Sequence, residues 1–354
     1  MDKKIKEKFM KIALKIAKKS LGKTNPNPMV GAIIVKNNKI ISKGWHKKYG
    51  KEHAEAEAIK KAGKKAKNST MFVTLEPCNH YGKQPPCTKA IIKAGIKEVY
   101  YAMKDPNKKS KQGAKELKKH GIKTNLGPCT KEAEELNEVF MKNIKDKECF
   151  FTLKIATTKD FYITWGNKKK KKITGKKANE FTQKLRKIHD AIIVGVNTII
   201  KDNPKLTYKK NQKENPIRII LDTKARTPIK AQTLKQKGTT IIVTTKKAKH
   251  KKILRLIKAG AKIIIAKEKK GKIDIKWLKK KLYEIGICSA LIEPGQKLAS
   301  TLIEEKLFDK MYIIISQKKV RKGLKAFKTK KEIKARLKDF KWLGKDMVFE
   351  MVKK

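Results

Sequence analysis

The sequence lacks the features that mark membrane and secreted proteins. None of its apolar runs approaches the roughly 18 residues of a membrane-spanning helix. Its first twenty residues are apolar at positions 5, 9, 12 and 16, the spacing of an amphipathic helix and not the unbroken apolar stretch of a secretory signal. Five cysteines among 354 residues are an odd, low number that does not suggest a disulfide framework. We therefore expect a protein of the reducing cytoplasm.

Acidic residues and arginine are also scarce. The chain has 93 Lys and Arg against 32 Asp and Glu, a formal net charge of +61, yet only six of the basic residues are Arg. Such a charge ordinarily suggests nucleic acid, but sites that recognise phosphates or bases favour Arg because its guanidinium donates two parallel hydrogen bonds. The Lys residues are spread over the whole chain. We interpret them as codon bias and expect nucleic-acid binding to be weak and nonspecific.

The length favours two domains, because 354 residues with 39% apolar composition exceed one average domain. A charged joint at 145–148 separates the expected domains, 1–145 and 149–354. In the first, the pattern predicts a helix within the first twenty residues, a hairpin over 29–42, helices over 53–65, 87–94 and 131–144, and strands over 71–75 and 97–103. This order predicts a layered α/β domain.

The second half repeats an alternation of apolar strands with helices. The expected strands cover 150–156, 191–196, 217–221, 240–244, 262–266, 290–292 and 311–315. The expected helices cover 176–188, 248–258, 274–285 and 297–306. Alternation of this kind predicts a largely parallel sheet with helices on its faces.

One His, one Glu and two Cys form the pattern with the most specific chemistry. His53 and Glu55 begin an expected helix, Cys78 follows a strand, and Cys87 opens another helix. One His and two Cys can bind a tetrahedral zinc ion and leave a position for water, beside which a Glu can act as general acid and base. Hydrolytic base deaminases have this layout. The alternative is ordinary helix composition with two buried Cys, but the ordered combination favours one zinc ion per chain.

The surrounding segments resemble the deaminase half of the bifunctional riboflavin-biosynthesis deaminase/reductase. The resemblance rests on TNPNPMVGAIIV (24–35), GWHKKYGKEHAE (44–55), VTLEPCNHYGKQPPCTKAI (73–91) and MKDPN (103–107). Eight residues separate the two Cys, where nucleic-acid and cytidine deaminases usually carry two. The resemblance implies a cytidine-deaminase-like three-layer α/β/α fold with Glu55 as the catalytic residue. It also implies substrate contacts at Asn27, His46, His80, Lys83, Asp105 and Asn107.

Some of these residues also have an ordinary structural interpretation. His46 and His80 could be loop histidines with satisfied hydrogen bonds, and Asp105-Pro106-Asn107 is a good turn sequence.

The second half resembles the reductase domain of the same family, which has a dihydrofolate-reductase-like α/β fold and uses NADPH. The resemblance rests on the strand at 153–156, on KLRKIHDAIIVGVNTIIKDNPKLT (184–207), on PIRIILDT (216–223), and on Glu293 with Gly295. It implies cofactor contacts at Ala156, Lys172, Thr198, Asp202, Thr223 and Gly295. It implies substrate contacts at Lys170, Arg186, Leu206, Lys209 and Glu293.

Several departures from the family pattern fall in this half, among them three single residues and the segment 316–320, which replaces a P-K-L-x-G motif. Phe161 and Pro294 stand where the family usually has Gly, and Lys172 stands where it has Trp, within five lysines at 168–172. Each change affects NADPH binding, since Gly permits close backbone approach and Pro lacks an N–H donor. Two interpretations stay open, a working reductase and a folded domain that only supports assembly.

Together these observations predict a cytoplasmic enzyme of riboflavin biosynthesis. The resemblance implies zinc-dependent deamination of 2,5-diamino-6-ribosylamino-4(3H)-pyrimidinone 5′-phosphate. It further implies NADPH reduction of the ribosyl group of 5-amino-6-(5-phosphoribosylamino)uracil, in a homo-oligomer that does not contact membranes. The alternatives are a deaminase with a degenerate second half and a zinc deaminase that acts on RNA bases.

Overall fold

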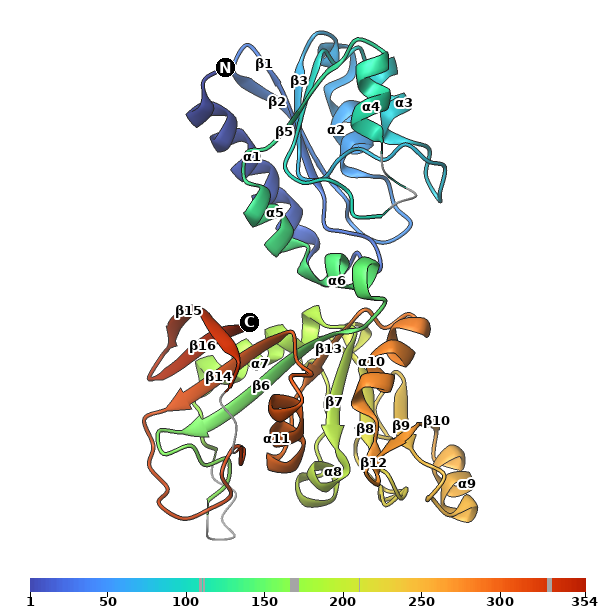
Figure 1. Cartoon of the computed structure of the whole chain (residues 1–354), viewed down its shortest axis with the longest axis vertical. Coiled ribbons are helices and arrows are strands. Elements are labelled where there is room, and N and C mark those ends of the chain that lie inside the picture. The colour runs from blue at the N-terminus through green and yellow to red at the C-terminus, as the bar shows by residue number, and fades with distance from the viewer. Residues whose placement is uncertain (108–109, 111, 166–171, 210, 330–332) are drawn as a thin grey trace. The chain divides into compact units, whose positions relative to one another are not determined.

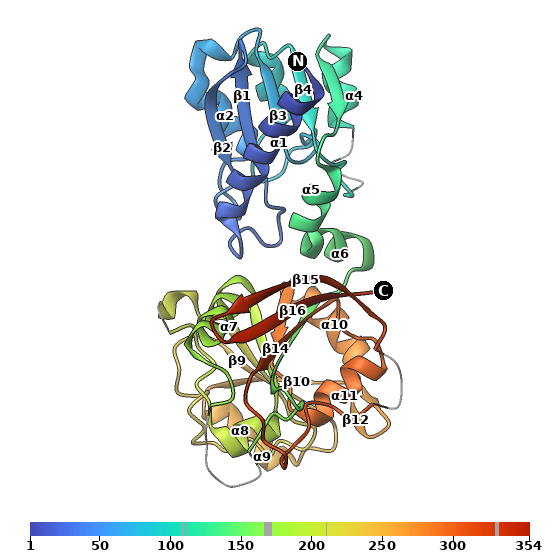
Figure 2. The same ribbon diagram turned by 90° about the vertical axis from the view of Figure 1, so that its left-hand side faces the viewer.

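The chain forms two compact units, Met1–Lys147 and Glu148–Lys354. A computed structural model describes residues 1–107, 110, 112–165, 172–209, 211–329 and 333–354. Each unit is a sheet covered by helices (Figures 1 and 2). Over the described ranges, no helix has the length and apolar character needed to span a membrane.

The first unit is built on a five-stranded sheet of order β2-β1-β3-β4-β5. Its strands are β1 (Gly31–Lys36), β2 (Lys39–Trp45), β3 (Thr70–Val73), β4 (Glu98–Tyr101) and β5 (Lys123–Leu126). Its helices are α1 (Lys3–Ala17), α2 (Ala54–Ala62), α3 (Cys87–Lys93), α4 (Gly113–Lys119), α5 (Thr130–Leu136) and α6 (Glu138–Asp146). Helices α1 and α5 lie on one face of the sheet, and α2, α3 and α4 lie on the other (Figure 1).

Most expected elements of this unit are confirmed. Strands β1 and β2 form the predicted antiparallel hairpin, and Asn37 and Asn38 in its turn have φ of 50° and 56°, which Asn tolerates better than most residues. The single helix expected over 131–144 is wrong, because the chain breaks at Asn137 into α5 and α6. Helix α4 and strand β5 were not expected, since their sequence is lysine-rich and has few apolar residues.

Two glycines let helices contact the backbone of this sheet. A Cβ on Gly31 would lie 2.3 Å from the carbonyl oxygen of Ala13 in α1, and one on Gly44 would lie 2.2 Å from that of Ala54 in α2. Side chains at either place would push the helix away from the sheet. Gly44 therefore allows α2, the helix that carries Glu55, to lie close to the backbone of β2.

The second unit is built on a nine-stranded sheet of order β10-β9-β8-β7-β13-β6-β14-β16-β15. Its strands are β6 (Phe150–Thr158), β7 (Ala191–Gly195), β8 (Ile217–Leu221), β9 (Thr240–Thr244), β10 (Ala261–Ile265), β13 (Ser289–Ile292), β14 (Lys310–Ser316), β15 (Ala335–Leu343) and β16 (Asp346–Lys353). A separate small hairpin pairs β11 (Glu268–Lys269) with β12 (Lys272–Ile273). The helices are α7 (Lys176–Ile188), α8 (Val196–Asp202), α9 (His250–Lys258), α10 (Ile275–Glu284) and α11 (Gln296–Glu304).

The predicted parallel sheet is confirmed from β10 to β14. Residues of α8 and α9 join the apolar core on one face, and residues of α10 and α11 join the core on the other. The antiparallel β15–β16 hairpin and helix α8 were not expected. Because parallel strands end at one edge of a sheet, the residues that follow β6, β7, β8 and β13 belong to a common edge.

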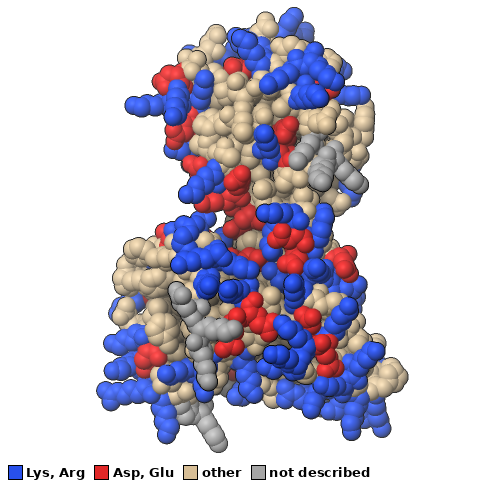
Figure 3. Space-filling view, viewed as in Figure 1, with Lys and Arg blue, Asp and Glu red and all other residues tan. Residues whose placement is uncertain are grey.

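Basic side chains are spread over the surface. On the face drawn in Figure 3, Lys and Arg occur on both units with Asp and Glu interspersed among them. This distribution agrees with the even spread of Lys along the sequence.

Candidate functional sites

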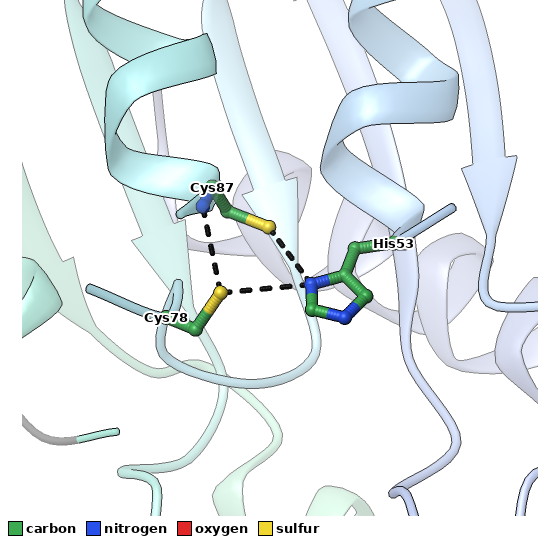
Figure 4. A group of neighbouring side chains, drawn as sticks. All are labelled: His53, Cys78 and Cys87. Atoms are coloured by element: carbon green, nitrogen blue, oxygen red, sulfur yellow. Dashed lines mark hydrogen bonds between the residues drawn. The ribbon is translucent and has the colours of Figure 1, made fainter. Parts of the chain in front are cut away.

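Three side chains from separate elements converge in the first unit. His53 directly precedes α2, Cys87 is the first residue of α3, and Cys78 lies in the loop after β3 (Figure 4). The Nδ1 atom of His53 lies 3.2 Å from Sγ of Cys87 and 3.5 Å from Sγ of Cys78. All three donor atoms lie within 4.8 Å of one another.

This donor set fits a zinc ion. Ideal tetrahedral zinc, with bonds of roughly 2.0 Å to nitrogen and 2.3 Å to sulfur, separates the two donors by about 3.5 Å. The two N···S distances, 3.2 and 3.5 Å, lie close to that separation. Three protein donors, one imidazole and two thiols, are also the chemistry of catalytic rather than structural zinc.

Cys78 is held in place by contacts to its side chain and to the preceding residue. The N–H of Cys87 donates to Sγ of Cys78 at 3.4 Å, and Gly113 at the start of α4 contacts the carbonyl of Pro77 so closely that a Cβ would lie 1.8 Å from it. The hydrogen bond from the Cys87 side chain, followed by those from His53 and the Cys87 N–H, lowers the pKa of the Cys78 thiol well below its usual range. A thiolate is the form that binds zinc.

Glu55 lies in the first turn of α2 and is 4% exposed. Burial raises the pKa of its carboxyl, and the neighbouring Cys78 thiolate raises it further. A buried carboxyl of this kind can take up and release a proton within the site.

His53, Glu55 and Cys78 line a cavity of about 250 Å³. All six substrate-contacting residues predicted for this half line it: Asn27, His46, His80, Lys83, Asp105 and Asn107. The walls also include residues that the sequence did not single out, among them Tyr49, Lys51, Glu76, Gln84 and Phe140. Their only sequence signal is position, because each is within a few residues of a predicted one or in the helix before the charged joint.

His46 orients the side chain of Asn27. Nδ1 of His46 lies 3.0 Å from the carbonyl oxygen of Glu52, which can only accept, so this nitrogen carries the proton. Burial lowers the pKa of the imidazole, which keeps it neutral. Nε2 is then an acceptor, and Nδ2 of Asn27 donates to it at 3.2 Å. The Asn27 amide therefore turns its carbonyl oxygen away from His46.

The eight residues between the cysteines form another wall. The ammonium of Lys83 lies 4.2 Å from the ring centroid of Tyr49, and Nε2 of Gln84 donates to the carbonyl of Gly50 at 3.2 Å. These contacts fasten the insert to the loop after β2. Nδ1 of His80 is buried and has no hydrogen-bond partner within the part of the chain that the structure describes. Such an atom in a cavity wall fits a polar ligand.

Asp105 and Asn107 form the turn that their sequence predicts and also line the cavity. The N–H of Asn107 donates to Oδ1 of Asp105 at 2.8 Å. Burial raises the pKa of the Asp105 carboxyl. The turn geometry and a binding role are therefore compatible.

In the second unit, Arg186 of α7 and Glu293 after β13 form a partly buried ion pair. Nε and Nη2 of Arg186 donate to the two carboxylate oxygens of Glu293 at 2.8 and 3.1 Å, and Nη1 donates to the carbonyl of Thr207 at 3.2 Å. Lys154 of β6 brings a second cation, with Nζ 3.9 Å from Glu293. The guanidinium of Arg186 and the ammonium of Lys154 overcome the effect of burial and lower the pKa of Glu293 to about 2.

Lys154 was not among the predicted residues. Burial lowers the pKa of its ammonium, and the opposing effect of the Glu293 carboxylate offsets this lowering only in part. A single Lys inside the otherwise uncharged strand FFTLKIATT was the available sequence signal.

Five other predicted residues of this unit lie on segments at or after the carboxyl ends of the parallel strands. Thr198 and Asp202 belong to α8 after β7, Thr223 follows β8, Gly295 immediately precedes α11, and Ala156 lies near the end of β6. The side chain of Leu206 is buried in an apolar core, so only its backbone could face a ligand. Lys209 donates its N–H to Gln183, Lys172 is exposed, and Lys170 lies outside the described residues.

The departures from the family pattern have local structural effects. Phe161 adopts a left-handed conformation with φ of 63° and is 45% exposed, in a tight turn in which its N–H donates to the carbonyl of Thr158. Asp160 beside it accepts from the N–H groups of Val320 and Arg321. Pro294 lies between the ion-paired Glu293 and Gly295. The substituted turn is thus held in shape by neighbouring contacts.

Comparison with known proteins links both units to described families. Residues 3–103 match the family described as "Cytidine and deoxycytidylate deaminase zinc-binding region", and residues 150–349 match "RibD C-terminal domain". The chain is 39% identical over 355 residues to the riboflavin biosynthesis protein RibD of Aquifex aeolicus, covering 98% of each chain. It is 32% identical over 326 residues to RibD of Escherichia coli, covering 88% of each.

Solved structures give the same picture over the whole length. A diaminohydroxyphosphoribosylaminopyrimidine deaminase/5-amino-6-(5-phosphoribosylamino)uracil reductase from Thermotoga maritima is 33% identical, with a TM-score of 0.89 and 99% of each chain covered. RibD of Acinetobacter baumannii is 31% identical, with a TM-score of 0.88 and the same coverage.

Proposed function

The chain belongs to the RibD family of riboflavin biosynthesis proteins, and on this basis we propose the two reactions that it catalyses. The first unit deaminates 2,5-diamino-6-ribosylamino-4(3H)-pyrimidinone 5′-phosphate. The second reduces the ribosyl group of 5-amino-6-(5-phosphoribosylamino)uracil with NADPH. The observation that carries the proposal is the His53–Cys78–Cys87 cluster beside a cavity that His53, Cys78 and buried Glu55 line, within a full-length family match.

For deamination, His53, Cys78 and Cys87 would hold zinc, which when bound supplies the Lewis acidity that makes water deprotonation accessible near neutral pH. Glu55 would take a proton from the attacking water. It would deliver that proton to the pyrimidine ring nitrogen, and then carry the second proton of the water, from the hydroxyl now bound to the ring carbon, to the departing amine, which leaves as ammonia. The raised pKa of its buried carboxyl supports this shuttle.

Substrate recognition would use the cavity wall. The outward-facing carbonyl oxygen of Asn27 can accept from an N–H on the pyrimidine, and His80 offers its unpartnered Nδ1. Lys83 and Lys51 provide ammonium groups for the phosphate, and Asp105 and Asn107 provide polar groups for the ribose.

For reduction, the residues at the strand edge fit a dinucleotide. A Cβ on Gly195 or on Gly295 would meet no atom within 4 Å, so open space lies above both glycines at the ends of the neighbouring strands β7 and β13. NADPH, when bound, supplies the reducing equivalent. Ala156, Lys172, Thr198, Asp202, Thr223 and Gly295 would hold it. Lys154 would donate a proton to the sugar while Arg186 and Glu293 fix the substrate.

One observation favours a second candidate, a deaminase whose second unit is inactive. Phe161 occupies a left-handed backbone position where the family usually has Gly, and it follows β6, one of the strands whose ends form the edge proposed for NADPH. Following NADPH oxidation with the deaminated substrate separates the two. Deamination without oxidation above background would establish the second candidate.

The deaminase assignment is tested with Glu55→Gln in the full chain. The amide retains the shape of the carboxyl but cannot shuttle a proton, so zinc content should be unchanged and ammonia release abolished. Near-normal ammonia release from the zinc-loaded variant would refute the role of Glu55. We also propose that the enzyme is cytoplasmic and forms a homo-oligomer. Sedimentation of the purified chain would test the oligomeric state.

A further inference from the structure

Asn137 is a buried amide that pairs with backbone 108 residues away. Its Oδ1 accepts from the N–H of Met29 at 2.8 Å, and its Nδ2 donates to the carbonyl of Met29 at 3.1 Å. The residue is 1% exposed. One side chain thus satisfies both polar groups of Met29, as a neighbouring strand would.

The pairing is available because Asn137 lies at the junction of two helices. Its N–H donates to the carbonyl of Ala133 at 3.1 Å, and its carbonyl accepts from the N–H of Met141 at 2.9 Å. Both backbone polar groups of Asn137 are therefore hydrogen-bonded within α5 and α6. The side-chain amide remains to pair with Met29. Helix α6 also contributes Phe140 to the cavity wall.

Met29 belongs to the segment that carries Asn27. The N–H of Asn27 donates to the carbonyl of Thr24 at 2.8 Å. The N–H of His46 donates to the carbonyl of Val30, the residue after Met29, at 2.9 Å. His46 also orients the Asn27 amide. The segment is thus held by His46 on one side and by Asn137 on the other.

We propose that Asn137 is a positioning residue for deamination, which holds the 24–30 segment so that Asn27 meets the pyrimidine. This inference rests on the proposed deamination at the His53 cluster. The three zinc-binding residues lie on α2, on α3 and in the loop after β3, and none of the contacts that fix Asn137 reaches them. Loss of the Asn137 amide should therefore weaken substrate binding and leave the metal in place.

The experiment uses the full chain with Asn137→Ala. Two neutral hydrogen bonds are removed, so kcat/KM for ammonia release should fall roughly tenfold, chiefly through a higher KM. Zinc per chain and NADPH oxidation with the deaminated substrate should be unchanged. Asn137→Gln retains the amide and should recover part of the lost kcat/KM.

Asn125→Ala is the matched control. Its Nδ2 donates to Glu98 at 3.1 Å within the same unit, but neither residue lines the cavity, so KM should stay at the parental value.

Three results would overturn the inference: an unchanged KM in zinc-loaded Asn137→Ala, loss of zinc from that variant, or an equal rise in KM in Asn125→Ala. The second would assign Asn137 to folding rather than to substrate binding. If the parental protein released no ammonia, the proposed function itself would fail, which distinguishes the two failures.

Discussion

Replacing Gly44 with alanine should impair deamination far more than it impairs folding. The new Cβ would lie 2.2 Å from the carbonyl oxygen of Ala54 and 2.5 Å from the backbone nitrogen of Ala58. Ordinary contact begins at 3.4 Å, so the first turn of α2 must move from β2 by roughly 1.2 Å. That turn carries Glu55, and His53 directly precedes it.

The displacement sets the size of the effect. A misplacement of about 1 Å between reacting groups can lower the rate roughly 100-fold, whereas overpacking of this kind costs about 1–3 kcal/mol of stability. We therefore expect kcat for ammonia release to fall by about two orders of magnitude in protein that still folds. Reduction in the second unit should not change.

Gly31→Ala provides the control. Its Cβ would lie 2.3 Å from a carbonyl of α1 on the opposite face of the sheet, and α1 carries none of the proposed site residues. Thermal unfolding, zinc content and ammonia release are measured for both variants. Equal losses of kcat in the two variants, or a parental kcat in Gly44→Ala, would refute the argument.

Three further predictions concern the second unit. Glu293→Gln leaves Arg186 and Lys154 without their carboxylate. We therefore expect the free energy of unfolding in urea to fall by about 2–3 kcal/mol and NADPH oxidation to fall strongly. An unchanged free energy of unfolding would contradict the importance of this ion pair. Burial lowers the pKa of His189 to about 4, so the unfolded chain binds an extra proton at this residue between pH 6.5 and 4. The contribution of His189 to the unfolding free energy should fall through that window by up to about 3 kcal/mol and no further below it, and His189→Gln should remove this part of the pH dependence. Phe161→Gly relieves a left-handed φ of 63° and should raise the unfolding free energy slightly, by up to about 1 kcal/mol; a lower unfolding free energy would show that the ring stabilises the fold.

Local sequence pattern predicted the elements whose causes are local. The β1–β2 hairpin follows from two apolar runs around Asn37-Asn38, and α7 follows from helical spacing over the residues where it was expected. The β15–β16 hairpin was missed because β15 is largely exposed and its apolar alternation is interrupted where the pairing register shifts between Leu337 and Asp339. The break at Asn137 was missed because its side-chain partner is Met29, far away in sequence.

The candidate sites divide in the same way. His53, Glu55, Cys78 and Cys87 were found because metal chemistry requires particular residue types in a particular order. Lys154 was missed because its meaning depends on Glu293, which only the fold brings within 3.9 Å. The roles of the individual residues stay predictions until the variants above are measured.

The large number of lysines on both units has a consequence for the transfer of substrate between the two reactions. A phosphorylated pyrimidine carries its negative charge through deamination and into reduction, and a surface with a net charge of +61 attracts it throughout. We therefore expect the intermediate released by one unit to stay near the protein surface longer than an uncharged molecule would. The yield of reduced product per ammonia should accordingly fall as added salt shortens the screening length, roughly 10 Å at 0.1 M ionic strength.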